Sequence, residues 1–495
     1  MSMIEIKKLT FGYEGSAENV FEDVSFQIDT DWRLGLVGRN GAGKTTFLHL
    51  LCGQYDYAGT ISAEVSFEYF PYEVREERRL TMDILDEIGG AYEFWELQRE
   101  FSLLRLPEEV LYRPFETLSN GEKTKTLLAV QFLKEKGFLL IDEPTNHLDG
   151  PSRILVGDYL HGKRGFILVS HDRAFLDLSI DHVLSLNRMD REIQKGDFSA
   201  WWENKERRDE FERRKNEKLK KEIGRLSEAA KRTSGWSKDV EDSKYGTRNS
   251  GLRVDRGHVG HQSAKMMKRS KSIESRWQTA LEEKEGLLKN VEEREALKLS
   301  PRTDLSGTLF SCRNLSLSYG EKTVAEGITF SIEPGSRMAL RGKNGSGKTT
   351  LLRLLCGEEV ACGGEMERNS RMTVSYVPQD TGFLKGSLRD FTRERGIDES
   401  LCKAILRKLG FPRSQLDRDM RGFSAGQKKK VLIAGSLSER AHLYVWDEPL
   451  NYIDVFSRRQ IEELLLENRP TLLFVEHDQS FCERIGTASV ALGEW

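Results

Sequence analysis

A phosphate-binding loop occurs twice in this chain, about three hundred positions apart. The two copies are Gly38-Arg39-Asn40-Gly41-Ala42-Gly43-Lys44-Thr45-Thr46 and Gly342-Lys343-Asn344-Gly345-Ser346-Gly347-Lys348-Thr349-Thr350. Both complete the pattern G-x-x-x-x-G-K-[ST], in which glycines let successive backbone N–H groups point at phosphate oxygens and a helix N-terminus faces the same anion. A single copy could be a glycine turn that caps a helix. Two copies, each with the partners described below, predict two nucleotide sites.

The residue types of the loops assign their roles. Lys44 and Lys348 are predicted to reach the β- and γ-phosphates of ATP, and Thr45 and Thr349 to bind Mg²⁺. The other loop residues predicted to contact ATP are Gly38, Asn40, Gly41, Gly43, Thr46, Gly342, Asn344, Gly345, Gly347 and Thr350.

Each half also has an acidic pair at the end of an apolar strand pattern. Asp142 and Asp447 are placed to bind Mg²⁺, and Glu143 and Glu448 follow them directly, where each can orient and deprotonate a water molecule. An acidic pair can instead cap a helix, but a phosphate loop upstream favours catalysis. The catalytic residues predicted on this basis, with a histidine at the end of the next strand of each half, are Glu143, Glu448, His171 and His477.

Composition limits the class of protein. The 495 residues are enough for two or three domains. No apolar run approaches the ~18 residues that cross a bilayer, and Met1–Lys8 does not have the pattern of a signal peptide. The six cysteines lack metal-ligand spacing, which indicates reduced thiols. We therefore expect a cytoplasmic protein without a membrane partner.

The two halves align on their phosphate loops as a repeat. Each begins with strand-like alternation, at Met3–Thr10 and Leu309–Ser316, and its last strand is expected at Gly165–Ser170 or Thr471–Glu476. Strands that alternate with helices predict an α/β fold with two P-loop ATPase domains. We place these domains at 1–198 and 305–495, joined by a helical linker at 199–304.

The linker pattern predicts two long antiparallel helices. Apolar residues recur at helical spacing from Phe211 to Ala230 and from Met266 to Val291, and glycines from Gly235 to Gly260 are expected to interrupt helix between them. About thirty residues per helix would extend roughly 45 Å.

The far end of the linker is basic, although the whole chain has a net charge of −3. Basic residues with interleaved aromatic rings suit phosphate contacts and stacking on unpaired RNA bases. A solvated face is the alternative, which we accept for Lys205–Lys221. The predicted RNA-binding residues are Lys238, Lys244, Tyr245, Arg248, Arg253, Arg256, Lys265, Lys268 and Arg269.

With these motifs the chain resembles the ATP-binding cassette superfamily. Leu118–Glu122 and Phe423–Gln427 resemble its signature loop, and Asp142–Asp149 and Asp447–Asp454 its magnesium and D-loop run. The resemblance implies that two cassettes pair head to tail within one monomer, so that each ATP lies between one phosphate loop and the opposite signature. Site one would combine Lys44, Glu143 and His171 with Ser424, and site two would combine Lys348, Glu448 and His477 with Ser119. It further implies ATP contacts by Gly121, Gly426, Tyr13 and Tyr319, and by Gln379, which would also contact Mg²⁺.

Some residues depart from the superfamily pattern. Tyr72 stands at the position that corresponds to Gln379, Asn120 replaces a glycine of the first signature, and Tyr452 stands where the first half has His147. We expect two sites with unequal hydrolysis rates, and the sequence leaves open which is slower.

Two cassettes with a long linker resemble the ABC-F class, and the segment Arg256–Lys271 resembles its antibiotic-resistance ribosome protection proteins of the Lsa and Vga type. The resemblance implies binding to the ribosomal E site in the ATP state, with the linker tip near large-subunit rRNA and P-site tRNA. It also implies release of lincosamides, pleuromutilins and streptogramin A from the peptidyl-transferase centre. Two alternatives stay open, an ABC-F translation factor that acts on stalled ribosomes without drug resistance, and the motor of an exporter.

Overall fold

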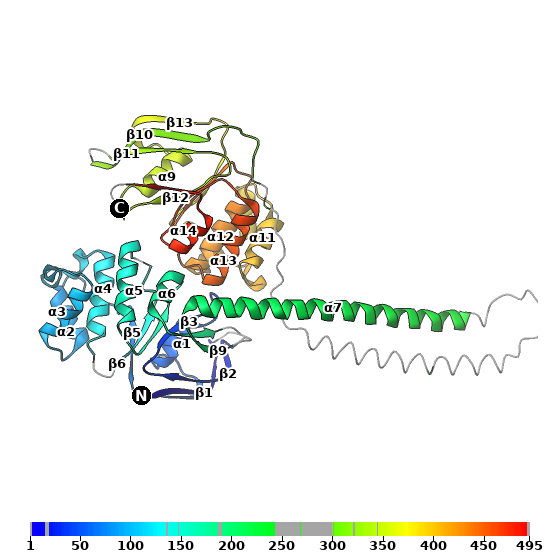
Figure 1. Cartoon of the computed structure of the whole chain (residues 1–495), viewed down its shortest axis with the longest axis horizontal. Helices are drawn as coiled ribbons and strands as arrows, with labels where there is room; N and C mark the ends of the chain where they lie inside the picture. The colour runs from blue at the N-terminus through cyan, green and yellow to red at the C-terminus, as the bar shows by residue number, and fades with distance from the viewer. Residues whose placement is uncertain are drawn as a thin grey trace, which may run out of the picture. The chain divides into compact units, whose positions relative to one another are not determined.

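The computed structural model describes residues 2–14, 19–134, 137–146, 148–186, 191–242, 268, 299, 301–319, 322–343 and 345–492 (Figure 1). The chain divides into two compact units, Met1–Trp201 with Glu295–Trp495, and Trp202–Arg294. We call the elements β1 to β9 the first cassette and the elements β10 to β17 the second cassette; both belong to the first unit. The predicted boundaries at 198 and 304 stay predictions.

The first cassette has two sheets. One is antiparallel with strand order β2-β1-β4, and the other has the order β5-β6-β7-β3-β8-β9, parallel except for β9. The elements are β1 (Met3–Phe11), β2 (Phe21–Asp29), β3 (Arg33–Val37), α1 (Lys44–Leu51), β4 (Ala58–Ser62), β5 (Ser66–Phe70), α2 (Thr81–Gly89), α3 (Phe94–Leu103), α4 (Asn120–Gln131), β6 (Gly137–Asp142), α5 (Gly150–His161), β7 (Phe166–Val169), α6 (Arg173–Ser179), β8 (His182–Leu186) and β9 (Arg191–Lys195).

The second cassette repeats this plan. Its antiparallel sheet has the order β11-β10-β13, and its parallel sheet has the order β14-β15-β16-β12-β17. The elements are β10 (Phe310–Tyr319), β11 (Lys322–Ile332), β12 (Arg337–Arg341), α9 (Lys348–Cys356), β13 (Ala361–Arg368), β14 (Val374–Val377), α10 (Leu388–Glu394), α11 (Glu399–Lys408), α12 (Ala425–Ser438), β15 (Leu443–Asp447), α13 (Val455–Asn468), β16 (Leu472–Val475), α14 (Gln479–Ile485) and β17 (Ala488–Ala491).

The predicted α/β class is confirmed, and the strands show why the site residues gather. The strands β6 and β15 are apolar and buried because helices cover both faces of a parallel sheet. Asp142 pairs in register with Val169, and Asp447 pairs with Val475. The carboxyl ends of neighbouring parallel strands therefore bring the acidic pair and the following histidine to one edge. In Figure 1, α9 lies between β12 and the antiparallel sheet, and one apolar core includes residues of all of them.

The prediction for the last strand of each cassette was wrong. Gly165–Ser170 and Thr471–Glu476 contain β7 and β16, but β8 and β9 follow in the first cassette and β17 follows in the second. These later strands extend the sheet on the far side of β3 and β12. These strands are short, and β8 and β17 pair with the buried strands β3 and β12, whereas β9 pairs with β8.

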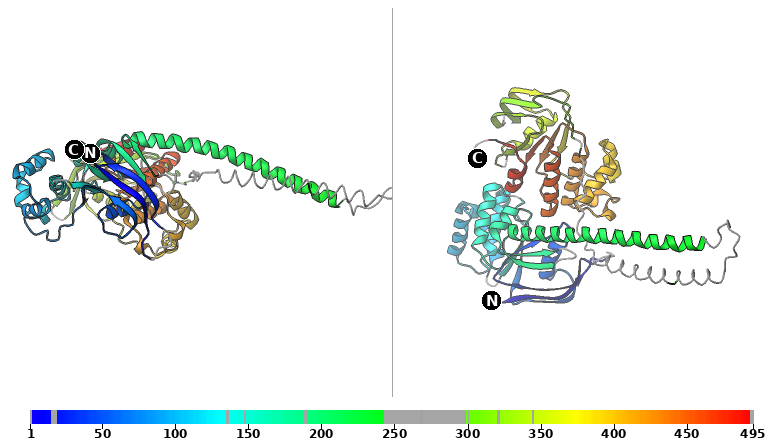
Figure 2. Two further views of the ribbon diagram at one scale, coloured as in Figure 1. Left: turned by 90° about the horizontal axis from the view of Figure 1, so that it is seen from below. Right: turned by 45° about the vertical axis from the view of Figure 1, so that its right-hand side comes forward.

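The helix α7 (Phe198–Asp242) forms the first arm of the predicted hairpin and has 45 residues, more than the thirty expected (Figure 2). It passes through Gly235, so the prediction that glycine interrupts the helix there was wrong. One glycine costs only about 1 kcal/mol relative to alanine inside a helix, which the surrounding helix formers offset. The second predicted helix, from Met266 to Val291, lies outside the described residues except for Lys268.

No helix among the described residues is long and apolar enough to span a lipid bilayer.

A glycine in β13 allows the second cassette's antiparallel sheet to close. Gly364 has φ +94°, and a Cβ atom there would lie 2.3 Å from the Asn314 carbonyl oxygen in β10. Gly307 has a similar φ of +84°, but a Cβ atom there would meet nothing within 4 Å.

We predict that Gly364→Ala lowers the unfolding temperature clearly more than Gly307→Ala does. Both substitutions carry the left-handed backbone strain of about 1–3 kcal/mol, and only the first adds a backbone clash. Thermal unfolding followed by circular dichroism measures both. Equal decreases in the unfolding temperature would show that the clash with the Asn314 carbonyl oxygen causes no additional loss of stability.

Candidate active site

The phosphate loops form tight turns at helix N-termini. Gly43 and Gly347 cap α1 and α9 with φ of +91° and +86°. Lys44 Nζ donates hydrogen bonds to the carbonyl oxygens of Gly38 at 2.9 Å and Arg39 at 3.3 Å. Lys348 Nζ donates at 2.8 Å to the two corresponding carbonyls of its own loop. Each ammonium is thus held inside its loop, and burial lowers the pKa of both lysines.

The oxygen atoms near each loop suit Mg²⁺. Thr45 Oγ1 donates to Asp142 Oδ2 at 2.7 Å, and in the second cassette Asp447 accepts a hydrogen bond from Thr349. Asp447 Oδ2 is buried and has no hydrogen-bond partner among the described residues. A hydroxyl and a carboxylate are the hard ligands that Mg²⁺ prefers, so these residues fit the ion. Bound there, Mg²⁺ would neutralise charge on the phosphates.

A tyrosine that the sequence reasoning missed also contacts the carboxylate that is predicted to bind Mg²⁺. Tyr69 on β5 donates its hydroxyl to Asp142 Oδ2 at 3.1 Å. Tyr376 stands in the corresponding place on β14, where burial and, after it, the charge of Asp447 raise its pKa. Both tyrosines precede a proline by two positions, and this shared spacing is the signal that could have identified them.

The two predicted catalytic glutamates lie near the predicted histidines but have different partners. His171 Nε2 is 3.3 Å from Glu143 Oε1, and His477 Nε2 is 3.6 Å from Glu448 Oε1. Glu448 Oε2 also accepts from Gln379 Nε2 and from Asn451 Nδ2, each at 2.7 Å. Both glutamates have positive φ, 52° and 45°, a strained conformation that is common at functional sites.

These surroundings move the two glutamate pKa values in opposite directions. Burial raises the pKa of Glu143 to about 8, and the charge of Asp142 adds to this effect. Burial also acts to raise the pKa of Glu448, but the nearby His477 and the hydrogen bond from Gln379 outweigh it and bring the pKa to about 2. Burial, with the nearby charge of Lys44, lowers the pKa of His171. The two predicted catalytic glutamates therefore have different surroundings, and the unequal hydrolysis rates stay a prediction.

The signature serines cap helices. Ser119 Oγ accepts from the backbone N–H of Glu122 at 3.2 Å, and Ser424 Oγ accepts from that of Gln427 at 3.3 Å. They are the N-caps of α4 and α12. Each helix thus presents its N-terminus, which favours anions, beside the serine.

A cavity of about 890 Å³ brings the predicted residues of site two together. One side comes from the first cassette and the other from the second, so the signature of one cassette faces the phosphate loop of the other. The predicted residues that line the cavity are Ser119, Gly121, Gly345, Gly347, Lys348, Thr349, Thr350, Gln379, Glu448 and His477.

At site one the facing loops of the two cassettes touch directly. Asn40 donates its backbone N–H to Asp454 Oδ2 at 3.2 Å and its side-chain amide to the Tyr452 carbonyl at 2.8 Å. A Cβ atom on Gly426 of the opposite signature would lie 2.6 Å from Asn40 Nδ2. Asp454 is held by Lys430 Nζ at 2.8 Å. Sequence reasoning named Asp454 only as the end of the D-loop run and did not single out Lys430, which follows two other lysines in the sequence.

Tyr13 contacts the first phosphate loop through Thr46. Tyr13 is 46% exposed, and its hydroxyl lies 2.7 Å from Thr46 Oγ1. Its contact with adenine stays a prediction. Tyr72 is exposed. The side chain of Tyr319 and all of Asn344 lie outside the described residues.

The structure describes two of the predicted RNA-binding residues. Lys238 lies in α7, but its side chain is outside the described part of the chain, and Lys268 is exposed. The remaining predicted residues, Lys244, Tyr245, Arg248, Arg253, Arg256, Lys265 and Arg269, also lie outside the described residues.

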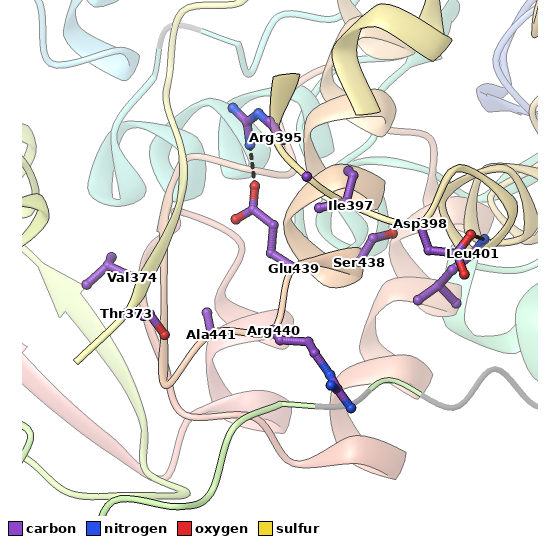
Figure 3. A pocket seen from close by; sticks show the side chains of 11 residues that line it. Thr373, Val374, Arg395, Ile397, Asp398, Leu401, Ser438, Glu439, Arg440 and Ala441 are labelled. Carbon is purple, nitrogen blue, oxygen red and sulfur yellow. Dashed lines mark hydrogen bonds and ion pairs between the residues drawn. The ribbon is translucent and has the colours of Figure 1, made fainter. Parts of the chain in front are cut away.

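A second cavity, of about 500 Å³, lies within the second cassette (Figure 3). Arg395 and Glu439 form an ion pair across it at 3.0 Å, and Ile397 and Val374 add apolar surface. None of the predicted site residues lines this cavity.

Two facing P-loop sites with a carboxylate and a histidine beside each loop define a tandem nucleotide-hydrolysing enzyme. Residues 21–146 and 325–451, together just over half of the chain, match the family described as ABC transporter. The chain belongs to this ATP-binding cassette family and is a tandem-cassette ATPase of the ABC-F type.

The alignments with similar proteins cover nearly the whole chain. The ribosome protection protein VmlR of Bacillus subtilis is 28% identical and covers 99% of this chain and 87% of its own. The energy-dependent translational throttle protein EttA of Haemophilus influenzae is 25% identical and covers 96% and 89%. The structure of a complex of archaeal ribosome recycling factor aABCE1 with stalk protein aP1 matches with a TM-score of 0.63 at 20% identity, covering 98% and 87%. The chain is thus related to proteins named for ribosome protection and translation.

We predict that Lys44→Ala and Lys348→Ala each weaken ATP binding at one site only, by about ten- to a hundredfold, because each removes a charged donor. Titration with a fluorescent ATP analogue should show two sites in the parent protein and one in each variant. Lys385→Ala, an exposed lysine away from both loops, is the control. Two unchanged sites in either variant would contradict these roles.

Proposed function

We propose that this protein is an ATP-dependent ribosome protection protein. In the ATP state it binds the ribosomal E site and displaces lincosamides, pleuromutilins and streptogramin A from the peptidyl-transferase centre. The observation that carries the proposal is the likeness to VmlR over 99% of the chain. The Lsa and Vga subgroup is part of the same proposal, as are a cytoplasmic location and a monomeric state.

The site geometry supports an ATP-operated clamp. Positive groups lie on both sides of the site-two cavity, with Lys348 on one side and the N-terminus of α4 on the other. A nucleotide phosphate chain that contacts both would hold the cassettes together. Hydrolysis and phosphate release would remove that link.

Hydrolysis in this proposal uses the residues at the strand ends. Glu143 and Glu448 orient and deprotonate the attacking water, and His171 and His477 contact the γ-phosphate. Gln379, which already donates to Glu448, would sense the γ-phosphate at site two.

The linker supplies the ribosome contacts in the proposal. The helix α7 has 45 residues, which at 1.5 Å rise is long enough to carry a tip roughly 65 Å from its start. The predicted RNA-binding residues near the tip would contact large-subunit rRNA and P-site tRNA.

A translation factor that acts on stalled ribosomes is the second candidate. The likeness to EttA over 96% of the chain favours it. Ribosome binding that leaves bound drug in place would select this candidate over drug displacement.

We predict that Glu143→Gln combined with Glu448→Gln makes the protein accumulate on ribosomes in the presence of ATP. Water activation is lost while the nucleotide contacts remain, so the closed state persists. Co-sedimentation with ribosomes, compared with and without ATP, measures the effect. Adding Lys44→Ala and Lys348→Ala should abolish it. ATP-independent sedimentation of the double glutamine variant would argue against clamp closure.

We also predict that expression in a susceptible bacterium raises tolerance to lincosamides or pleuromutilins severalfold. The measurement is the minimum inhibitory concentration, with protein amounts checked by immunoblot. Replacing residues 244–253 at the linker tip should remove tolerance more than ATPase activity. Unchanged tolerance at good expression would reject drug protection, and equal loss of both activities would mean that the tip is structural.

A further inference from the structure

We propose that Arg173 and Glu462 are positioning residues that form a one-sided ion pair between the cassettes and align site one for ATP hydrolysis. This inference rests on the ATPase activity alone and does not depend on the proposed ribosome function. Neither residue touches the reacting atoms. Their effect would pass through the two elements that border site one.

The pair has the geometry of a fork between two cassettes. Arg173 begins α6 of the first cassette, and its two terminal nitrogens lie 2.9 and 3.5 Å from the two carboxylate oxygens of Glu462 on α13. The Glu462 side chain is completely buried, and that of Arg173 is 13% exposed. Two parallel contacts from a planar guanidinium fix orientation as well as distance. Such a buried pair resists sliding of one cassette over the other.

Both ends of the pair lead to site one. Arg173 is two residues after His171, which lies beside Glu143, and the intervening Asp172 caps α6. Glu462 is on the helix whose N-cap is Asp454, the residue that accepts the hydrogen bond from Asn40 of the first phosphate loop. The ion pair therefore connects the part of site one that the first cassette supplies, around His171, to the part that the second cassette supplies, around Asp454.

The equivalent positions around site two hold no charges. Aligning His171 with His477 places Gln479 at the position of Arg173, and aligning Asp149 with Asp454 places Gly157 at that of Glu462. Gln479 Nε2 donates to Glu483 on its own helix at 2.8 Å, and Gly157 has no side chain. The same ion pair cannot form there, so the two interfaces differ by residue type.

The second cassette itself supplies other cations to Glu462. Arg484 Nη1 lies 3.5 Å and Arg459 Nη1 lies 3.7 Å from Glu462 Oε2. Loss of Arg173 therefore does not leave this buried carboxylate without a countercharge. Alignment between cassettes, rather than neutralisation of Glu462, is the part that Arg173 alone supplies.

The test compares the two sites separately. Glu448→Gln leaves site one as the active site, and Glu143→Gln leaves site two. Adding Arg173→Gln, which copies the residue at the site-two position, should lower the ATPase rate of site one on the order of tenfold, because misalignment of reacting groups slows chemistry. The rate of site two should change less than about twofold. Phosphate release from the purified full chain, without ribosomes, is the measurement.

Three further variants keep the result interpretable. Arg484→Gln removes a cation from the same carboxylate within one cassette and should leave both rates close to those of the parent. Arg173→Lys keeps the charge and should restore part of the site-one rate. Glu462→Gln should act like Arg173→Gln, and the combined variant should be no slower than either alone. The single variant Glu462→Gln also serves as the test if Arg173→Gln does not fold.

Two outcomes would overturn the inference. Equal slowing of both sites would make the pair a general stabiliser of the interface, and an unchanged site-one rate would give it no role in alignment. Failure of drug protection in cells would leave this inference intact, since the assay contains only protein and ATP.

Discussion

The structure depends on the opposition of a helix N-terminus in one cassette to the phosphate loop of the other. At site two the N-terminus of α4, with Ser119, lines the same cavity as Lys348 and Glu448. Each wall presents hydrogen-bond donors and partial positive charge, which repel one another and attract a polyphosphate. Residues of both cassettes line this cavity, so we expect nucleotide binding and cassette pairing to be coupled. The order of elements that brings each strand end to this edge is the same in both halves.

The repeat is nevertheless not symmetric in its chemistry. Gln379 and Asn451 hold Glu448 in place, and burial next to Asp142 dominates the surroundings of Glu143. Site one has direct loop contacts through Asn40, and the Arg173–Glu462 pair lies on its side only. A tandem enzyme with two different sites can use one to hold the cassettes together and the other to time their separation. The sequence differences between the halves, such as Tyr72 at the position that corresponds to Gln379, are consistent with two sites of different roles.

Much of the site could be predicted from the sequence because its parts are local. A phosphate loop needs a fixed run of glycines, and an acidic pair at a strand end needs only an apolar strand before it. The contacts that were missed join residues that lie far apart in the sequence. Asp454 meets Asn40, and Glu462 meets Arg173, across the cassette interface. No periodicity or motif records such a pairing, since it depends on how two folded domains pack. The short strand β8 and the passage of α7 through Gly235 were missed for a related reason, because neighbouring structure outweighs local propensity.

The most direct test of the paired arrangement asks which ATP site a signature residue serves. Ser119→Arg places a large cation in the first signature, and the ATPase rate is then measured with either Glu143→Gln or Glu448→Gln present. If the cassettes pair as in this structure, the substitution abolishes hydrolysis at site two, whose phosphate loop belongs to the second cassette, and spares site one. Loss at site one with site two unaffected would contradict the account.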